Sequence, residues 1–125
     1  MGGRSNSFRD LDVWKKAIFL AKKMYELTEK FPGREAFGLS NQLRRSAVSV
    51  ASNIAEGQAR NSKKEFLYFL NVSVGSLAEI ETQLIIAKEI GYVSEEIQDQ
   101  FLLITDELTR MVKGLMNHLK GKDKF

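Results

Sequence analysis

The sequence predicts an all-α fold, an antiparallel up-down-up-down four-helix bundle, and three observations support this expectation. One proline and nine glycines occur in the 125 residues, and they leave four long segments uninterrupted. Each segment carries apolar residues at the three- and four-residue spacing of one helical face. The connections between the segments are short, which is typical of neighbouring antiparallel helices.

The first helix is expected to begin at Asp10 or Asp12, because either side chain can cap a helix. It should end near Lys30, since Pro32 and Gly33 follow directly and cannot easily continue it. The expected apolar stripe comprises Trp14, Ile18, Ala21 and Tyr25, widened by Leu11, Leu20, Met24 and Leu27.

The second helix is expected to run from about Ala36 to Glu56 and to end at Gly57, a glycine in the position of a C′ residue. Its expected core stripe comprises Leu39, Leu43, Ala47, Val50 and Ile54. Spacings of 4, 3 and 4 also align a polar strip of Arg45, Ser49, Ser52 and Glu56. This strip is either a recognition surface or a set of hydrogen bonds that fix the register of the helix.

The third helix is expected to begin with a capping box, in which Ser62 accepts the Glu65 amide proton and Glu65 reaches back, and to end near Gly91. One apolar seam comprises Phe66, Leu70, Leu77, Ile80, Leu84 and Ala87. A second seam, about 100° around the helix, comprises Leu67, Val74, Ala78 and Ile85. Because a single bundle needs one seam per helix, the second seam is the candidate oligomer interface. The alternative is a central helix contacted from three sides.

The fourth helix is expected to start at Ser94 and to reach about Lys120. Glu95 and Glu96 fall in its first turn, where negative charge is favourable to the helix dipole. The expected apolar stripe comprises Ile97, Phe101, Ile104, Leu108, Met111, Leu115 and Leu119.

The chain length favours one domain, with the bundle in residues 8–120, a flexible lead in 1–7 and a tail in 121–125. The composition, 43% hydrophobic and 28% charged, is that of a globular protein. No stretch of the sequence is apolar enough for a membrane span, and residues 1–7 lack the apolar run of a secretory signal. We therefore expect a cytoplasmic protein without a membrane partner.

The composition also excludes several kinds of chemistry. The sequence has no cysteine and only one histidine, His118, so thiolate chemistry and paired imidazoles are excluded. Glu-x-x-His metal motifs, glycine-rich phosphate loops and nucleophile elbows do not occur in the sequence. We therefore predict no enzymatic activity, no catalytic residue, no metal site and no cofactor.

The charge is unevenly distributed, because residues 1–64 carry 13 Lys and Arg against 6 Asp and Glu, whereas residues 65–125 carry 6 against 10. A candidate phosphate cradle at the start of the third helix comprises Arg60, Lys63 and Lys64. A candidate basic face on the first two helices comprises Lys15, Lys16, Lys22, Lys23, Arg44 and Arg45. Both regions predict contacts with the phosphates of RNA or DNA, and ordinary solvated surfaces are the alternative.

Three ordered blocks carry a resemblance to a known family: FRDLDVWKKA at 8–17, FGLSNQLRRSAVS at 37–49 and SNIAEG at 52–57. They resemble the 23S rRNA intervening-sequence proteins, also called four-helix-bundle proteins. The resemblance implies a homopentamer whose gene in some bacteria lies within an insertion in the large ribosomal RNA gene. The family is also similar to the accessory variability determinant of diversity-generating retroelements, a basic pentamer that binds nucleic acid and a reverse transcriptase. The family often has proline where this chain has Ala51, which leaves open whether the second helix is kinked.

These observations lead to a hypothesis of a non-enzymatic homo-oligomer, a pentamer by resemblance, that binds RNA or DNA through its phosphates. Symmetric copies would sum their modest charges along a continuous polyanion. The alternative is a protein-interaction scaffold whose partner is another protein, such as a polymerase. Salt separates the two hypotheses, because phosphate binding weakens steeply as the salt concentration rises and apolar contacts do not.

Overall fold

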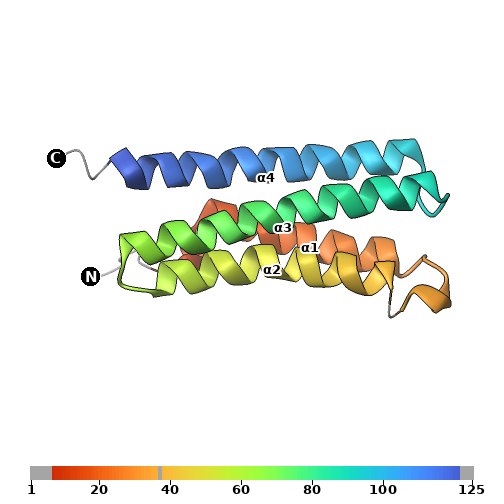
Figure 1. Cartoon of the computed structure of the whole chain (residues 1–125), viewed down its shortest axis with the longest axis horizontal. Coiled ribbons are helices and arrows are strands. Elements are labelled where there is room, and N and C mark those ends of the chain that lie inside the picture. Colours follow the sequence, from red (N-terminus) through yellow and green to blue (C-terminus); the bar gives the residue numbers. More distant parts are fainter. Residues whose placement is uncertain (1–6, 37, 122–125) are drawn as a thin grey trace.

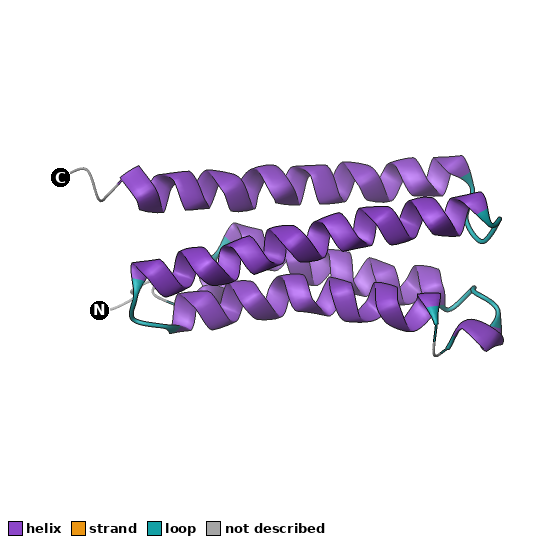
Figure 2. Cartoon of the chain, in the orientation of Figure 1, coloured by secondary structure: helices purple, strands orange, loops and turns teal. Residues whose placement is uncertain are grey.

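The computed structural model describes residues 7–36 and 38–121, which form four long helices and two short 3-10 helices (Figure 1). In chain order the elements are η1 (Phe8–Asp10), α1 (Asp12–Thr28), η2 (Gly33–Glu35), α2 (Leu39–Ala59), α3 (Lys63–Glu89) and α4 (Glu95–Gly121). Figure 2 shows that helix accounts for nearly all of the described chain, which contains no strand. The predicted all-α four-helix fold is confirmed. The expected lead and tail lie outside the described residues, except for Ser7 and for Gly121, which ends α4.

Successive helices run in opposite directions, so both termini lie at the same end of the bundle (Figure 1). The α2 helix packs against both α1 and α3, and α3 also packs against α4. The contact between α1 and α4, which closes the bundle, is the least extensive. An ion pair crosses it, with Lys16 Nζ 2.9 Å from Glu107 Oε1.

The core lies along the bundle axis, and the seams predicted for α2 and α3 lie in it. The fully buried members on these two helices are Leu43, Ala47, Val50, Ile54, Leu70, Ile80, Leu84 and Ala87, with Leu77 only 1% exposed. On α4 the buried line comprises Phe101, Thr105, Leu108 and Val112. The other predicted members on α4 are half-buried and pack against the core: Ile97, Ile104, Met111, Leu115 and Leu119.

The stripe predicted for α1 was confirmed in part, because Leu20 and Met24 are buried and Trp14, Ala21 and Leu27 pack half-buried against the core. Its buried face comprises Val13, Ala17, Leu20, Met24 and Thr28. Ile18 and Tyr25 are instead 44% and 46% exposed. Both lines have helical spacing and lie about 100° apart, so the spacing alone does not select one of them. The packing of α2 and α4 against α1 decides which line is buried.

The α1 helix begins at Asp12, one of the two predicted starts, but the predicted side-chain cap was wrong. The N-cap residue is Leu11, which forms no side-chain capping hydrogen bond. Asp10 belongs to η1, and Ser7 caps that element by accepting a hydrogen bond from the Arg9 amide at 3.1 Å. The helix ends at Thr28, whose hydroxyl donates to the Met24 carbonyl at 2.8 Å.

The boundaries predicted for α2 need correction at both ends. The helix starts at Leu39, whose amide donates to Glu35 Oε1 at 2.9 Å. It continues past Gly57, the expected C′ residue, to Ala59, and Gly57 does not have a positive φ. Gly57 is instead buried where α2 meets α3. The helix runs without a break through Ala51, the position where the resembled family often has proline.

The serine caps of α3 and α4 are present, whereas the Glu65 carboxylate of the predicted capping box pairs with Arg60. Ser62 Oγ accepts a hydrogen bond from the Glu65 amide at 3.2 Å, and Ser94 Oγ accepts one from the Ile97 amide at 3.1 Å. After α3, Gly91 adopts a φ of 90°, and the Tyr92 amide donates to the Ala87 carbonyl at 2.8 Å. This is the Schellman arrangement, in which glycine allows the left-handed turn after a helix.

At the end of the bundle opposite the termini, hydrogen bonds connect the α1–α2 connection with the α3–α4 connection. The Tyr92 hydroxyl donates to Glu35 Oε2 at 2.7 Å, while the other Glu35 oxygen holds the first turn of α2. The hydrogen bonds from the Leu39 amide and then from Tyr92 lower the pKa of Glu35. The same bond to Glu35 raises the pKa of Tyr92. The start of α2 is thereby tied to the connection between α3 and α4.

Candidate functional site

Grooves between neighbouring helices of the described chain differ in their chemistry. The α1–α2 groove is apolar and is lined by Phe8, Trp14, Ile18, Ala21, Val48, Ala51, Ser52 and Ala55. The α2–α3 groove is polar and is lined by Gln42, Arg45, Ser46, Ser49, Glu79 and Gln83. The α3–α4 groove lies near the chain termini and is lined by Asn71, Val74, Lys113, Met116, Asn117 and Lys120.

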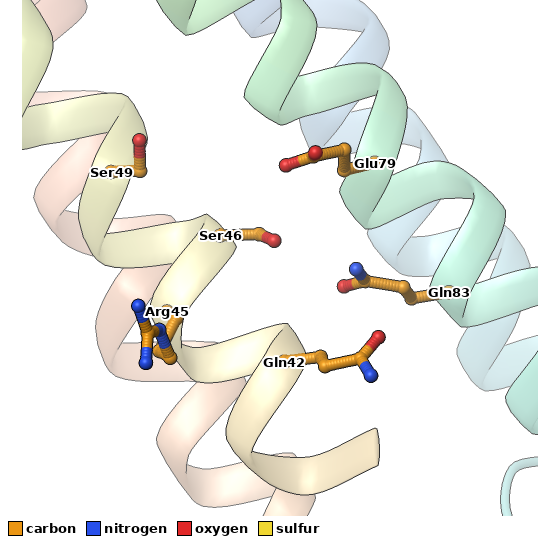
Figure 3. A pocket seen from close by; sticks show the side chains of 6 residues that line it. All are labelled: Gln42, Arg45, Ser46, Ser49, Glu79 and Gln83. Carbon is orange, nitrogen blue, oxygen red and sulfur yellow. The ribbon is translucent and has the colours of Figure 1, made fainter. Parts of the chain in front are cut away.

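The α2–α3 groove has a cavity volume of about 390 Å³ and holds converging polar side chains (Figure 3). Gln42 and Ser46 extend from α2 toward Gln83 on α3, and Glu79 extends from α3 across toward α2 (Figure 3). The Gln83 Oε1 atom is buried and has no hydrogen-bond partner among the described residues. An unsatisfied buried acceptor of this kind is rare in folded proteins.

The two charges of this groove are not paired with each other. Neither Arg45 nor Glu79 forms an ion pair with any described residue, although both line the same groove. The neighbouring Ser49 is committed to the fold, because its hydroxyl lies 2.9 Å from that of Ser76 and joins α2 to α3. Within the predicted polar strip, Ser49 therefore forms a hydrogen bond inside the protein. Arg45 instead lines the groove and has no ion pair with a described residue.

Replacing Gln83 with leucine should leave the free energy of unfolding unchanged or raise it by about 1 kcal/mol, because the change removes a buried acceptor that lacks a partner among the described residues. Urea unfolding of the two proteins at equal concentration measures the difference. A Gln42→Leu variant controls for added surface apolarity, since Gln42 is exposed. A loss of more than about 1 kcal/mol in the Gln83 variant would mean that Gln83 has a partner in solution.

The structure places the three residues of the candidate phosphate cradle together at the start of α3. Arg60 is paired with two carboxylates, Glu56 Oε2 at 2.6 Å and Glu65 Oε1 at 2.8 Å. The hydrogen bonds that Arg60 donates, to Glu56 with the larger effect and then to Glu65, raise the pKa of Arg60. Lys64 is exposed and forms no ion pair with a described residue. The charge of Arg60 is therefore already neutralised, and Lys64 is the cradle residue that is available to a phosphate.

The candidate basic face contains both paired and unpaired lysines. Lys16 pairs with Glu107, and Lys23 Nζ lies 3.7 Å from Glu26 Oε1. Lys15 and Lys22 are exposed on α1 and form no ion pair with a described residue. These two lysines lie on the side of α1 that faces away from the core.

Arg44, the arginine next to Arg45, is part of the α1–α2 packing. Its Nε donates to Thr28 Oγ1 at 2.6 Å, and its guanidinium lies 4.6 Å from the centre of the Tyr25 ring. The Glu29 Oε2 atom lies 3.6 Å from Arg44 Nη2. These contacts assign Arg44 a structural role in joining the two helices.

Folding converts the charge asymmetry of the sequence into a difference between the two ends of the bundle. The half that contains the termini, here called the basic end, comprises residues 8–19, 50–74 and 109–121. It carries nine Lys and Arg against four Asp and Glu. The described residues of the other half, 20–36, 38–49 and 75–108, carry seven against eleven. The basic end is therefore +5 and the opposite half −4.

The α3–α4 groove lies at this basic end, and the sequence reasoning missed its polar residues. Lys113 and Lys120 line it without an ion pair to a described residue, together with the amides of Asn71 and Asn117. Lysine and asparagine side chains are common donors to phosphate oxygens. Spacings of 4 and 3 between Lys113, Asn117 and Lys120 place them on one helical face, and that pattern was available in the sequence.

The candidate oligomer seam is only partly exposed in one copy of the chain. Leu67 and Val74 are half-buried, and Val74 packs against the core of its own bundle. Ala78 is exposed, and Ile85 is 46% exposed. Other large apolar side chains of α3 are also exposed, namely Tyr68, Ile86 and Ile90. An apolar surface therefore extends along α3 beyond the predicted seam.

No His, Asp and Glu side chains among the described residues gather in groups of three or more that would suit a metal ion. None of the helices in residues 7–36 and 38–121 has the length and apolarity to cross a membrane.

The sequence and fold are similar to those of known proteins. The sequence pattern of a family described as 23S rRNA-intervening sequence protein matches residues 9–114. A similar fold occurs in the crystal structure of a protein with unknown function from the S23 ribosomal protein family of Bacteroides thetaiotaomicron. That comparison has a TM-score of 0.78 at 21% identity, and it covers 84% of this chain and 95% of the other. No curated protein matches the chain significantly.

Proposed function

Because the chain belongs to the 23S rRNA-intervening sequence protein family, we propose that it is a non-enzymatic cytoplasmic homo-oligomer, a pentamer, that binds RNA or DNA through its phosphates. The observation that carries this proposal is the concentration of positive charge at one end of the bundle. The phosphate contacts are assigned to cations of that end without an ion pair to a described residue: Lys15, Lys64, Arg110, Lys113 and Lys120.

Assembly into an oligomer would combine the modest positive charges of the basic ends of several copies. A ring of parallel copies would place five basic ends on one rim, and a polyanion that touches several of them binds multivalently. Each phosphate that is neutralised releases condensed counterions, which favours binding at low salt. In this mechanism the bundle acts as a rigid support for the cations.

A protein-interaction scaffold is the second candidate, and the exposed apolar side chains favour it. Tyr68 is 63% exposed and Ile90 is 53% exposed on α3, while the apolar α1–α2 groove is open on another face. Apolar surfaces of this kind are typical of protein contacts. The affinity of such apolar contacts would depend only weakly on the salt concentration.

The affinity for a mixed-sequence RNA or DNA should fall by orders of magnitude as salt rises from about 50 to about 200 mM. A fluorescence-anisotropy titration at several salt concentrations measures this dependence. On a log-log plot, each phosphate contact should contribute about −0.7 to −0.9 to the slope. A flat response, or no binding at about 50 mM salt, would reject the proposal and leave the scaffold.

Two matched double variants test which half of the bundle contacts the nucleic acid. The variant Lys113→Gln with Lys120→Gln should weaken binding and make the salt slope shallower, because both lysines lie at the basic end. The control Lys22→Gln with Lys30→Gln removes the same charge from the opposite half and should have a smaller effect. Equal losses in the two variants would show that net charge, and not the basic end, determines binding.

A further inference from the structure

Two charges of opposite sign lie on one face of the bundle without a partner in their own chain. Arg45 on α2 and Glu79 on α3 are both exposed, and neither forms an ion pair with a described residue. Figure 3 shows that Glu79 extends toward α2, whereas Arg45 does not extend toward α3. This face therefore offers one cation and one anion to another molecule.

The two charges lie at nearly the same height along the bundle. The hydroxyls of Ser49 on α2 and Ser76 on α3 lie 2.9 Å apart, and they fix the register of these two antiparallel helices (Figure 1). Arg45 lies four residues from Ser49, and Glu79 lies three residues from Ser76 in the same direction along the bundle. At a rise of about 1.5 Å per residue, the heights of the two Cα atoms differ by only about 1.5 Å.

Each charge is accompanied by exposed apolar side chains at its own edge of the face. Arg45 lines a hollow beside α1, together with the exposed side chains of Tyr25 and Val48. Glu79 lines a hollow on the α3 side, together with the exposed side chain of Ile86. Apolar contacts with charged groups at their border are typical of protein interfaces.

We infer that this face binds a second copy of the chain, with Arg45 of one copy paired to Glu79 of the next. A rotation axis parallel to the bundle keeps every residue at its own height, so the α1–α2 edge of one copy meets the α3 edge of its neighbour at the level of these two charges. Because the two edges are different surfaces, the contact is heterologous, the kind that closes into a ring with an odd number of copies. The inference rests on the proposed function for the ring of parallel copies, and it assigns the interface of that ring.

The position and charge of this face favour a second copy over other occupants. A nucleic acid would be repelled by Glu79 and by the net charge of −4 on this half of the described chain. An unrelated protein would need a surface with the complementary pair of charges, whereas a second copy necessarily carries it. The contact also leaves the basic end uncovered, so assembly and phosphate binding use different parts of the chain.

Charge reversal in the full-length protein tests the pairing. Arg45→Glu and Glu79→Arg should each bring like charges together at every interface and raise the dissociation constant of the assembly by about tenfold or more. The double variant restores opposite charges and should recover the wild-type mass. Multi-angle light scattering over a dilution series measures the mass, and circular dichroism measures the helix content. The matched control Asp106→Arg reverses an exposed charge on α4, outside both hollows, and should leave the assembly intact.

A mixture of the two single variants gives a second test that a purely local effect on the fold would not pass. Arg45→Glu carries two negative charges at the interface and Glu79→Arg carries two positive charges, so each variant pairs with the other and repels itself. The mixture should therefore assemble more tightly than either variant alone. A ring of five copies contains at least one mismatched contact in such a mixture, so the recovery should be smaller than in the double variant.

The outcomes separate this inference from the proposed function. An assembled wild-type protein whose mass is unchanged by both single reversals overturns the inference and leaves the oligomer to another face. Loss of assembly in both single variants without recovery in the double variant also overturns it, because the two charges then do not pair. Recovery in the double variant, together with no RNA binding at about 50 mM salt, supports the inference and rejects phosphate binding. A monomeric wild-type protein overturns both the inference and the proposed assembly.

Discussion

Replacement of Gly57 with alanine should lower the free energy of unfolding by about 2 kcal/mol. A Cβ at this position would lie 2.9 Å from Phe69 Cβ, 3.0 Å from Phe66 Cδ1 and 3.3 Å from the Phe66 backbone. The last of these atoms belongs to the main chain of α3 and cannot rotate away. Alanine therefore forces α2 and α3 apart, and this cost exceeds the gain in helix propensity of about 0.5–1 kcal/mol.

The control for Gly57 is Gly114, which lies inside α4, where an added Cβ would meet no described atom within 4 Å. Gly114→Ala gains the same propensity without a clash, so it should raise the free energy of unfolding by about 0.5–1 kcal/mol. Urea unfolding at one fixed protein concentration compares the three proteins. A stabilised Gly57→Ala protein would contradict the close approach of α2 and α3.

Gly57 also illustrates why the helix ends were harder to predict than the helices. A glycine after an amphipathic stretch is compatible with a left-handed C′ turn or with close helix packing, and the sequence does not distinguish them. The structure uses Gly91 for the turn and Gly57 for the packing. The caps at Ser62 and Ser94 were predictable because capping depends on a local spacing of three residues.

The core faces of α2 and α4 were predictable because each has one dominant apolar line, and on α3 the longer of its two seams is the buried one. On α1 two such lines lie next to each other, and the predicted line of Trp14 and Ile18 borders the α1–α2 groove. The buried line, which includes Val13 and Ala17, was selected by the positions of the neighbouring helices. A choice that depends on tertiary contacts cannot be derived from spacing within one helix.

The candidate sites were predictable only where they are local in sequence. The pairing of Glu56 with Arg60 follows an i, i+4 spacing that the sequence displays. The α2–α3 groove instead joins residues from two helices, and its buried Gln83 acceptor becomes apparent only once they pack. Charge segregation toward one end also required the antiparallel order, because each half combines parts of all four helices.

Introduction of Ala78→Glu together with Ile85→Glu should dissociate the proposed oligomer into monomers that keep their helices. Both positions are accessible in one copy of the chain, so the charges are solvated in the monomer and buried only in the assembly. An uncompensated buried charge costs about 3–5 kcal/mol, which raises a dissociation constant by more than about a hundredfold. Val74 is unsuitable for this test, since it packs within its own bundle.

The matched control is Leu103→Glu on α4, where the leucine is 71% exposed and lies away from the seam. This variant adds a charge at an exposed apolar position and should leave the assembly intact. Multi-angle light scattering at micromolar concentration measures the mass of each protein, and circular dichroism measures its helix content. A monomeric wild-type protein would reject the oligomer, and a stable tetramer or hexamer would reject the pentamer. If only Leu103→Glu dissociates the assembly, the interface lies on α4, because a buried charge disrupts only the surface that contains it.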